Sequence, residues 1–156
     1  MIKKYQIIYA DPPWSFKTYS KPIDGKHFRF DDTGWRNADV HYPCMSFIDI
    51  RALPVASISD DNCVLFLWVT APCLEQGLQV IRDWGFTYKT RAFNWVKTNK
   101  SGGVFTGMGY WTRSNSEDCL LATKGHPWRV NANVSQIIIS QRKLIAKSQK
   151  RLEIEL

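Results

Sequence analysis

The stretch Tyr5-Gln6-Ile7-Ile8-Tyr9-Ala10-Asp11-Pro12-Pro13-Trp14 decides how this chain is interpreted. Its apolar run over residues 5–10 predicts a short strand. Two consecutive prolines cannot continue a sheet ladder, because proline has no N–H to donate, so the strand should end at Asp11. In open α/β sheets, ligands bind at the carboxyl ends of the strands. The pattern therefore places a carboxylate where a catalytic residue would be expected.

Two helices are predicted in the first half of the chain. Ser46 followed by Asp49 forms a capping-box pattern, which predicts a short helix over residues 47–53. A second helix should begin at Pro72 and end at Gly85, because proline suits a first helical turn and glycine suits a helix end. This second helix carries one apolar stripe, made of Leu74, Leu78 and Ile81.

The remaining apolar runs predict strands, and the order of elements indicates the fold class. The run over residues 64–69 has no polar alternation, which is typical of a strand covered on both faces, and a turn should precede it at 60–62. Three further strands are predicted over residues 86–96, 118–123 and 136–140. Strands separated by helices predict an α/β domain with a mostly parallel sheet and helices on its faces.

Residues 1–156 are expected to form a single domain, because this length suits one hydrophobic core. Segments 15–40 and 97–113 should be loops, the first rich in turn-forming residues and the second rich in glycine. Residues 141–156 form a basic tail. The first residues lack the apolar core of a secretory signal, and the longest apolar run is too short to span a bilayer. We therefore expect a cytoplasmic protein without a membrane partner.

The charge of the chain favours a polyanionic partner, and its cysteines do not indicate a metal. The net charge is +7, and basic proteins attract nucleic acid because each phosphate contact releases counterions. No two cysteines have C-x-x-C spacing, and the three histidines form no ligand cluster with them, so no metal site is predicted. The cysteines are Cys44, Cys63, Cys73 and Cys119.

The chemistry available to residues 11–14 suits a weak nitrogen nucleophile. The amino nitrogen of adenine has a delocalised lone pair, so a catalyst must hold that nitrogen in position. The carboxylate of Asp11 could accept one N–H and the carbonyl of Pro12 the other, with Pro13 fixing the backbone. Trp14 could stack on the base. The alternative is a simple turn that ends a strand, since Asp before Pro-Pro is a common turn sequence.

Beyond these four residues, several segments together resemble one enzyme family. The motif Asp11-Pro12-Pro13-Trp14 resembles that of the DPPW adenine methyltransferases, which include the eukaryotic messenger-RNA adenosine methyltransferase and short phage and bacterial members. The resemblance covers roughly residues 5 to 142, and several motifs occur in the family's order. These are the segments 41–46, 65–70, 84–86, 94–99 and 117–125.

This resemblance implies a Rossmann-like sheet that uses S-adenosylmethionine, with the motifs in permuted order. Asp11 would hold the target amino group and lie beside the methionine part of the cofactor. Arg142 would correspond to a family arginine at the cofactor, and Tyr42 would line the pocket of the target base. The basic loop from Lys97 to Arg113 would track nucleic acid, with Lys97 expected to contact phosphate, and the neighbouring Trp95 would also bind the substrate.

The chain departs from the family pattern in two places, which leaves alternatives open. Ser116 stands where some members have a lysine that contacts the cofactor. The family's H-S-x-K-P stretch has no match after Arg142, so we expect an incomplete C-terminal part. DNA is the expected substrate, with RNA as the alternative. A different class of function is a non-catalytic remnant that binds nucleic acid through its basic loop.

Overall fold

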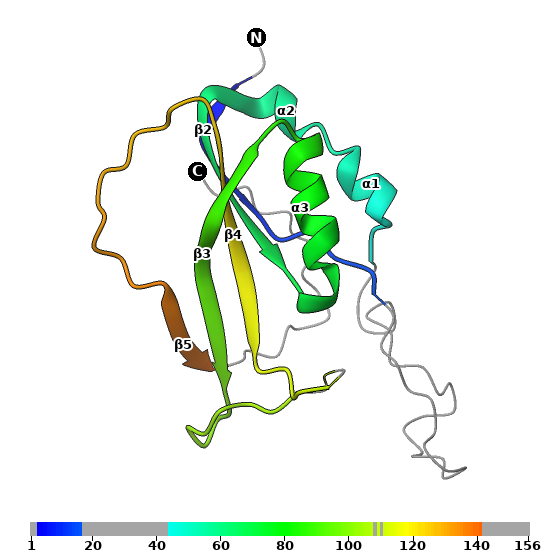
Figure 1. Cartoon of the computed structure of the whole chain (residues 1–156), viewed down its shortest axis with the longest axis vertical. Helices are drawn as coiled ribbons and strands as arrows, with labels where there is room; N and C mark the ends of the chain where they lie inside the picture. Colours follow the sequence, from blue (N-terminus) through cyan, green and yellow to red (C-terminus); the bar gives the residue numbers. More distant parts are fainter. Residues whose placement is uncertain (1–2, 17–43, 108, 110, 142–156) are drawn as a thin grey trace.

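The computed structural model of the protein describes residues 3–16, 44–107, 109 and 111–141. Nearly all of the predicted loop over 15–40 and the tail beyond Gln141 lie outside the described residues. The described part is an α/β arrangement with one five-stranded sheet (Figure 1). Its elements are β1 (Tyr5–Ala10), α1 (Phe47–Arg51), α2 (Val55–Ile58), β2 (Ser59–Val69), the 3-10 turn η2 (Ala71–Cys73), α3 (Leu74–Asp83), β3 (Thr87–Thr98), β4 (Ser116–Lys124) and β5 (Ile137–Gln141).

The sheet has the strand order β1-β2-β4-β3-β5. The pairs β1–β2 and β3–β5 are parallel, whereas β4 is antiparallel to both of its neighbours. The prediction of a mostly parallel sheet is therefore wrong for two of the four pairs, because β4 follows β3 through a loop rather than a crossover helix. Four strands still point in one direction, so their carboxyl ends gather along the same edge of the sheet.

Strand β2 is covered completely on one face only. Alternate side chains, from Cys63 to Val69, are fully buried, whereas Phe66 and Trp68 on the other face remain partly exposed. The expectation of a strand covered on both faces is therefore too strong. The predicted turn at residues 60–62 is also wrong, because these residues belong to β2, where its pairing with β1 shifts register.

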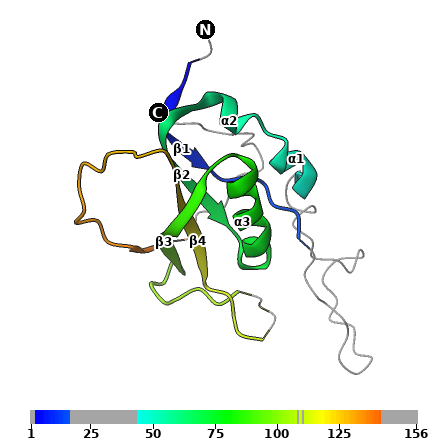
Figure 2. The same cartoon turned by 45° about the horizontal axis from the view of Figure 1, so that its top comes forward.

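The helix α3 lies across the buried face of the sheet, with α1 and α2 on the same side (Figures 1 and 2). Its buried residues include Gly77, Val80 and Ile81, whereas Leu74 of the predicted stripe is 40% exposed. A Cβ atom at position 77 would lie 2.5 Å from the Cγ1 atom of Val69. Glycine is thus required where the helix approaches β2, and this close contact moves the buried stripe away from Leu74.

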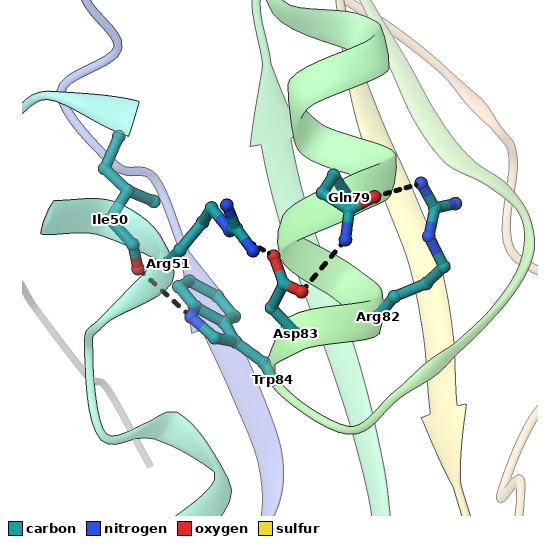
Figure 3. A network of polar contacts seen from close by, with 6 residues as sticks. All are labelled: Ile50, Arg51, Gln79, Arg82, Asp83 and Trp84. Carbon is teal, nitrogen blue, oxygen red and sulfur yellow. Dashed lines mark hydrogen bonds and ion pairs between the residues drawn. The ribbon is translucent and has the colours of Figure 1, made fainter. Parts of the chain in front are cut away.

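Helix α1 confirms the capping prediction. The Ser46 hydroxyl accepts a hydrogen bond of 3.1 Å from the backbone N–H of Asp49. Figure 3 shows how α1 is attached to α3: the guanidinium of Arg51 pairs with Asp83, and the buried indole of Trp84 donates to the carbonyl of Ile50. The exposed ion pair contributes little, so the buried indole is the stronger link.

Two further findings concern the ends of the predicted elements. Gly85 ends α3 with a positive φ of 81°, as the sequence predicts. Helix α2 was not predicted, because it has only four residues and begins directly after Pro54, where the sequence indicated the end of the preceding helix. Among the described residues, no helix has the length and apolar character needed to cross a membrane.

Candidate active site

A cleft of about 250 Å³ opens on the sheet face opposite α3, towards the carboxyl ends of β1, β2, β3 and β5. Its lining comes from all five strands of the sheet and from Asp11, the residue that follows β1. The lining residues are Tyr9, Asp11, Trp68, Trp95, Glu117, Ile138 and Ser140. The sheet thus brings together residues separated by more than a hundred positions in sequence, and Asp11 lies where the first strand was predicted to deliver it.

The carboxyl of Asp11 is held in an unusual electrostatic environment. Partial burial of the carboxyl and the nearby charge of Glu117 raise the pKa of Asp11 to about 6, and Lys97 partly offsets this rise. Desolvation is the largest cause, because it disfavours the charged carboxylate. The residue is still accessible to solvent at the cleft. A carboxyl with a perturbed pKa in a cleft is a candidate for a functional group.

Aromatic side chains form two walls of the cleft. On one side, the indole Nε1 of Trp68 donates a hydrogen bond of 2.5 Å to the Tyr9 hydroxyl, and the two rings meet edge to face with centroids 6.5 Å apart. On the other side, the indole Nε1 of Trp95 donates to the Ser140 hydroxyl at 2.8 Å. These bonds fix both indoles, so the cleft offers oriented flat surfaces that suit a planar ring.

Lys97 contacts two of the residues that line the cleft. Its ammonium forms an ion pair with Glu117 and lies 5.1 Å from the ring centroid of Trp95. Its side chain is 17% exposed. The expected phosphate contact would require this ion pair to break. The ammonium acts instead on the wall of the cleft, through attraction to the carboxylate and to the aromatic face.

The other residues of the motif hold its backbone in place. The carbonyl of Pro12 accepts a hydrogen bond of 2.8 Å from the Trp14 N–H, and the carbonyl of Pro13 accepts one of 2.9 Å from Met45. The Trp14 side chain is 3% exposed and belongs to the core. The stacking role expected for Trp14 therefore needs correction, because a buried indole presents no face to a base. In this structure Trp14 fixes the position of Asp11 and the prolines.

The remaining predicted site residues are not brought into the cleft by the described structure. Arg113 is exposed in the loop between β3 and β4. Tyr42 and Arg142 lie outside the described residues. The sequence interpretation assigned no role to Tyr9, Trp68, Glu117 or Ser140, although each stands near the end of a strand that faces the site. For Tyr9 and Trp68, the alternation with buried neighbours at a strand end was the available signal, whereas the strands around Glu117 and Ser140 show no such alternation.

The lining chemistry defines which ligands could be held here. No group of three or more potential metal ligands occurs within residues 3–16, 44–107, 109 and 111–141. Two carboxyl groups, Asp11 and Glu117, share the cleft with aromatic rings. Carboxylates accept hydrogen bonds from amino groups, and both carboxylates and aromatic faces attract cations. The cleft is therefore suited to a flat ring that bears an amino group and to a positively charged centre.

Comparison with known proteins shows the family to which the chain is similar. The family model described as MT-A70 matches residues 5–155. The type II methyltransferase M.MunI of Mycoplasma is 34% identical over 129 residues, which are 79% of this chain and 52% of that protein. The human N(6)-adenosine-methyltransferase catalytic subunit METTL3 is 27% identical over 141 residues, which are 89% of this chain and 20% of that protein.

A third relative shows the same coverage. An N(6)-adenosine-methyltransferase MT-A70-like protein of Drosophila melanogaster is 29% identical over 141 residues, 89% of this chain and 20% of that protein. The chain thus spans about half the length of one curated relative and a fifth of the other two. Because the family model covers nearly the whole sequence, the chain belongs to the MT-A70 family.

Proposed function

We propose that the chain transfers a methyl group from S-adenosylmethionine to the exocyclic amino group of adenine in nucleic acid. The observation that supports this most strongly is the position of Asp11, which follows β1 directly and lines a cleft walled by aromatic rings. Family membership points to the same chemistry, since the relatives are methyltransferases by name and two of them act on N(6) of adenosine. The reaction needs alignment of the amino nitrogen more than acid–base strength.

In this proposal, Asp11 is the principal acceptor for the amino group. Its carboxylate takes a hydrogen bond from one N–H and so directs the nitrogen lone pair towards the methyl donor. The Pro12 carbonyl already accepts the Trp14 N–H, and its second lone pair is the candidate acceptor for the other N–H of the base. The prolines and the buried Trp14 keep these two acceptors at a fixed separation.

S-Adenosylmethionine fits the residues that are present. Bound, this cofactor supplies a methyl group on a positively charged sulfur. The carboxyl groups of the cleft, which include that of Asp11, and the indole of Trp95 suit a cation. We propose that Asp11 also neighbours the methionine part of the cofactor and that Arg142 contributes to its binding, both by the family resemblance.

The proposed substrate is DNA, with RNA as the alternative. The chain resembles the short DNA-modifying members of the family, and it is more similar to the type II methyltransferase than to the adenosine methyltransferases. Trp95 and Tyr42 are proposed to border the target base. Arg113, exposed in a basic loop, is proposed to contact phosphate, and the net charge of +7 favours any such polyanion.

The test is calorimetric titration of S-adenosylmethionine into the purified chain, followed by methylation of adenine-containing DNA and RNA. Saturable binding with one site, then formation of N(6)-methyladenine, is the expected result. A folded protein that binds neither S-adenosylmethionine nor its demethylated product would contradict the proposal. Nucleic-acid binding by such a protein would favour the alternative function, a binding chain without catalysis.

A further inference from the structure

Glu117 is a second acidic side chain in the cleft, and the proposed reaction gives it no part in holding the amino group. It is the second residue of β4 and stands opposite Trp95 of β3. Glu117 and Asp11 line the same cleft of about 250 Å³. Two carboxyl groups in one small site repel each other when both are ionised, so the charge of each affects the protonation of the other.

Lys97 fixes the position of the Glu117 side chain. The ammonium pairs with the Glu117 carboxylate, and its approach to the Trp95 ring restrains it from a second direction. Trp95 is itself held by the hydroxyl of Ser140. Glu117 therefore carries its negative charge at a defined place, on an element different from the one that carries Asp11.

We propose that Glu117, held by Lys97, is a positioning residue that sets the protonation of the Asp11 carboxyl, which lines the same cleft. The Lys97–Glu117 ion pair places two opposite charges near Asp11. The negative member favours the protonated form of Asp11, and the positive member favours the ionised form that can accept an N–H. The consequence for adenine binding rests on the proposed function, whereas the effect on Asp11 itself does not.

The other titratable groups near Asp11 are neutral at physiological pH. The pKa of the Tyr9 hydroxyl is raised above its ordinary value, chiefly by burial, and burial raises the pKa of the Cys119 thiol to about 12. Neither group therefore carries charge in the range where Asp11 titrates. Glu117 and Lys97 are the charged groups that act on this carboxyl in the described structure, with opposite effects on its pKa.

Opposite effects give the proposal a sharp test. Glu117→Gln removes a negative charge and leaves Lys97 unpaired near Asp11, so the Asp11 pKa should fall by at least about half a unit. Lys97→Met removes the positive charge, so the pKa should rise. The double variant should titrate near the wild type, because both charges are gone. A purely structural role for this ion pair would predict no such difference in sign.

A matched control lies on the same two strands. Arg91 of β3 pairs with Asp118 of β4 at 2.7 Å, one residue along from Glu117. Asp118 is not among the charges that shift the pKa of Asp11. Asp118→Asn therefore breaks a comparable β3–β4 ion pair without changing the field at Asp11, and the Asp11 pKa should stay at its wild-type value.

The experiment is a pH titration of the Asp11 side-chain carboxyl by carbon-13 NMR in the full chain without ligand. We expect a lower pKa in Glu117→Gln, a higher one in Lys97→Met, and wild-type values in Asp118→Asn and in the charge-conserving Glu117→Asp. Amide spectra establish that each variant is folded, and the double variant provides a second comparison if one single variant unfolds. An unchanged pKa in folded Glu117→Gln, or shifts of the same sign in both single variants, would overturn the proposal.

A second readout separates this inference from the proposed function. The acid limb of methyl transfer against pH should move in the direction of the Asp11 pKa in each variant. Opposite NMR shifts with no methyl transfer by the wild type would refute the proposed function and leave the role of Glu117 intact. Methyl transfer by the wild type with no NMR shift in the variants would refute the role of Glu117 alone.

Discussion

The indole Nε1 of Trp14 donates a hydrogen bond of 2.8 Å to the backbone carbonyl of Trp68. This bond ties the end of the Asp11–Trp14 motif to the carboxyl end of β2. The side chain of the same Trp68 lines the cleft and donates to Tyr9. One residue of β2 therefore holds the motif through its backbone and shapes the ligand cleft through its ring, which couples the stability of the core to the geometry of the site.

The first prediction concerns Trp14 as a core residue. Trp14→Ala should lower the free energy of unfolding by about 3–5 kcal/mol, because it removes a large buried side chain and leaves a cavity. Trp14→Phe should keep much of the packing and lose the bond to Trp68, with a smaller cost. Urea unfolding followed by circular dichroism measures both. Trp128→Ala is the control, since that side chain is 91% exposed and should change stability by no more than about 0.5 kcal/mol.

The second prediction concerns the close approach of α3 to β2 at Gly77. Gly77→Ala should cost about 1–3 kcal/mol through overpacking against Val69. The higher helix propensity of alanine offsets roughly 1 kcal/mol of this cost. Adding Val69→Ala should make the Gly77→Ala change less costly, which a double-mutant cycle of thermal unfolding detects. Gly103→Ala is the control, because a Cβ atom there meets nothing within 4 Å. Additive effects of the two core substitutions would refute the contact.

The third prediction follows from the raised pKa of Asp11, which is about 6 in the folded protein against an ordinary value of 3.8. The folded state binds this proton more tightly, so its contribution to stability is full below 3.8 and is lost as pH rises through about 6. Asp11→Asn should therefore stabilise the protein near about pH 8, by roughly 1 kcal/mol after allowance for solvent at this accessible residue.

The gain from Asp11→Asn should disappear near about pH 4, where the wild-type carboxyl is protonated in the folded state. Urea unfolding of both proteins across this pH range provides the measurement. A stability difference that does not vary with pH, or one that grows towards acid, would show that the pKa of Asp11 is not raised.

The fourth prediction separates two basic residues by their role in nucleic-acid binding. Arg113→Ala should reduce the slope of log affinity against log salt by about 1, as expected for one lost phosphate contact. Lys97→Met should leave that slope unchanged, because the ammonium is already paired with Glu117. Fluorescence anisotropy with single- and double-stranded DNA over a range of salt concentrations measures both. A reduced slope in Lys97→Met would restore the phosphate role expected for Lys97.

The sequence predicted the elements of the fold better than the way they pair. The strand at residues 5–10, the capped helix after Ser46 and the glycine that ends α3 follow from local signals, and the structure confirms each of them. The reversed direction of β4 depends on where the chain returns after β3, which no local pattern encodes. Of the predicted stripe on α3, Ile81 is buried and Leu78 packs against the core, and only Leu74 is exposed. The contact at Gly77 was missed because glycine has no side chain, so hydrophobic periodicity does not register it.

Two of the residues that line the candidate cleft, Asp11 and Trp95, were predicted from the sequence, and the other lining residues were not. Asp11 was found because a motif marks it at the end of a strand. Glu117 and Ser140 reach the same cleft only through strand pairing. Trp14 was predicted to stack on the target base because aromatic residues in a motif suggest stacking, yet its indole is buried in the core. Burial depends on what surrounds a residue in three dimensions, and residue type alone does not carry that information.

The most direct test of the account is whether this chain forms N(6)-methyladenine in an Asp11-dependent way. The purified protein is incubated with S-adenosylmethionine and adenine-containing DNA, and the nucleosides are analysed by mass spectrometry, with Asp11→Asn and Asp118→Asn in parallel. The account predicts N(6)-methyladenine with the wild type and with Asp118→Asn, and none above background with Asp11→Asn. Equal product from the folded Asp11→Asn protein would contradict the assignment of Asp11 as the residue that holds the amino group.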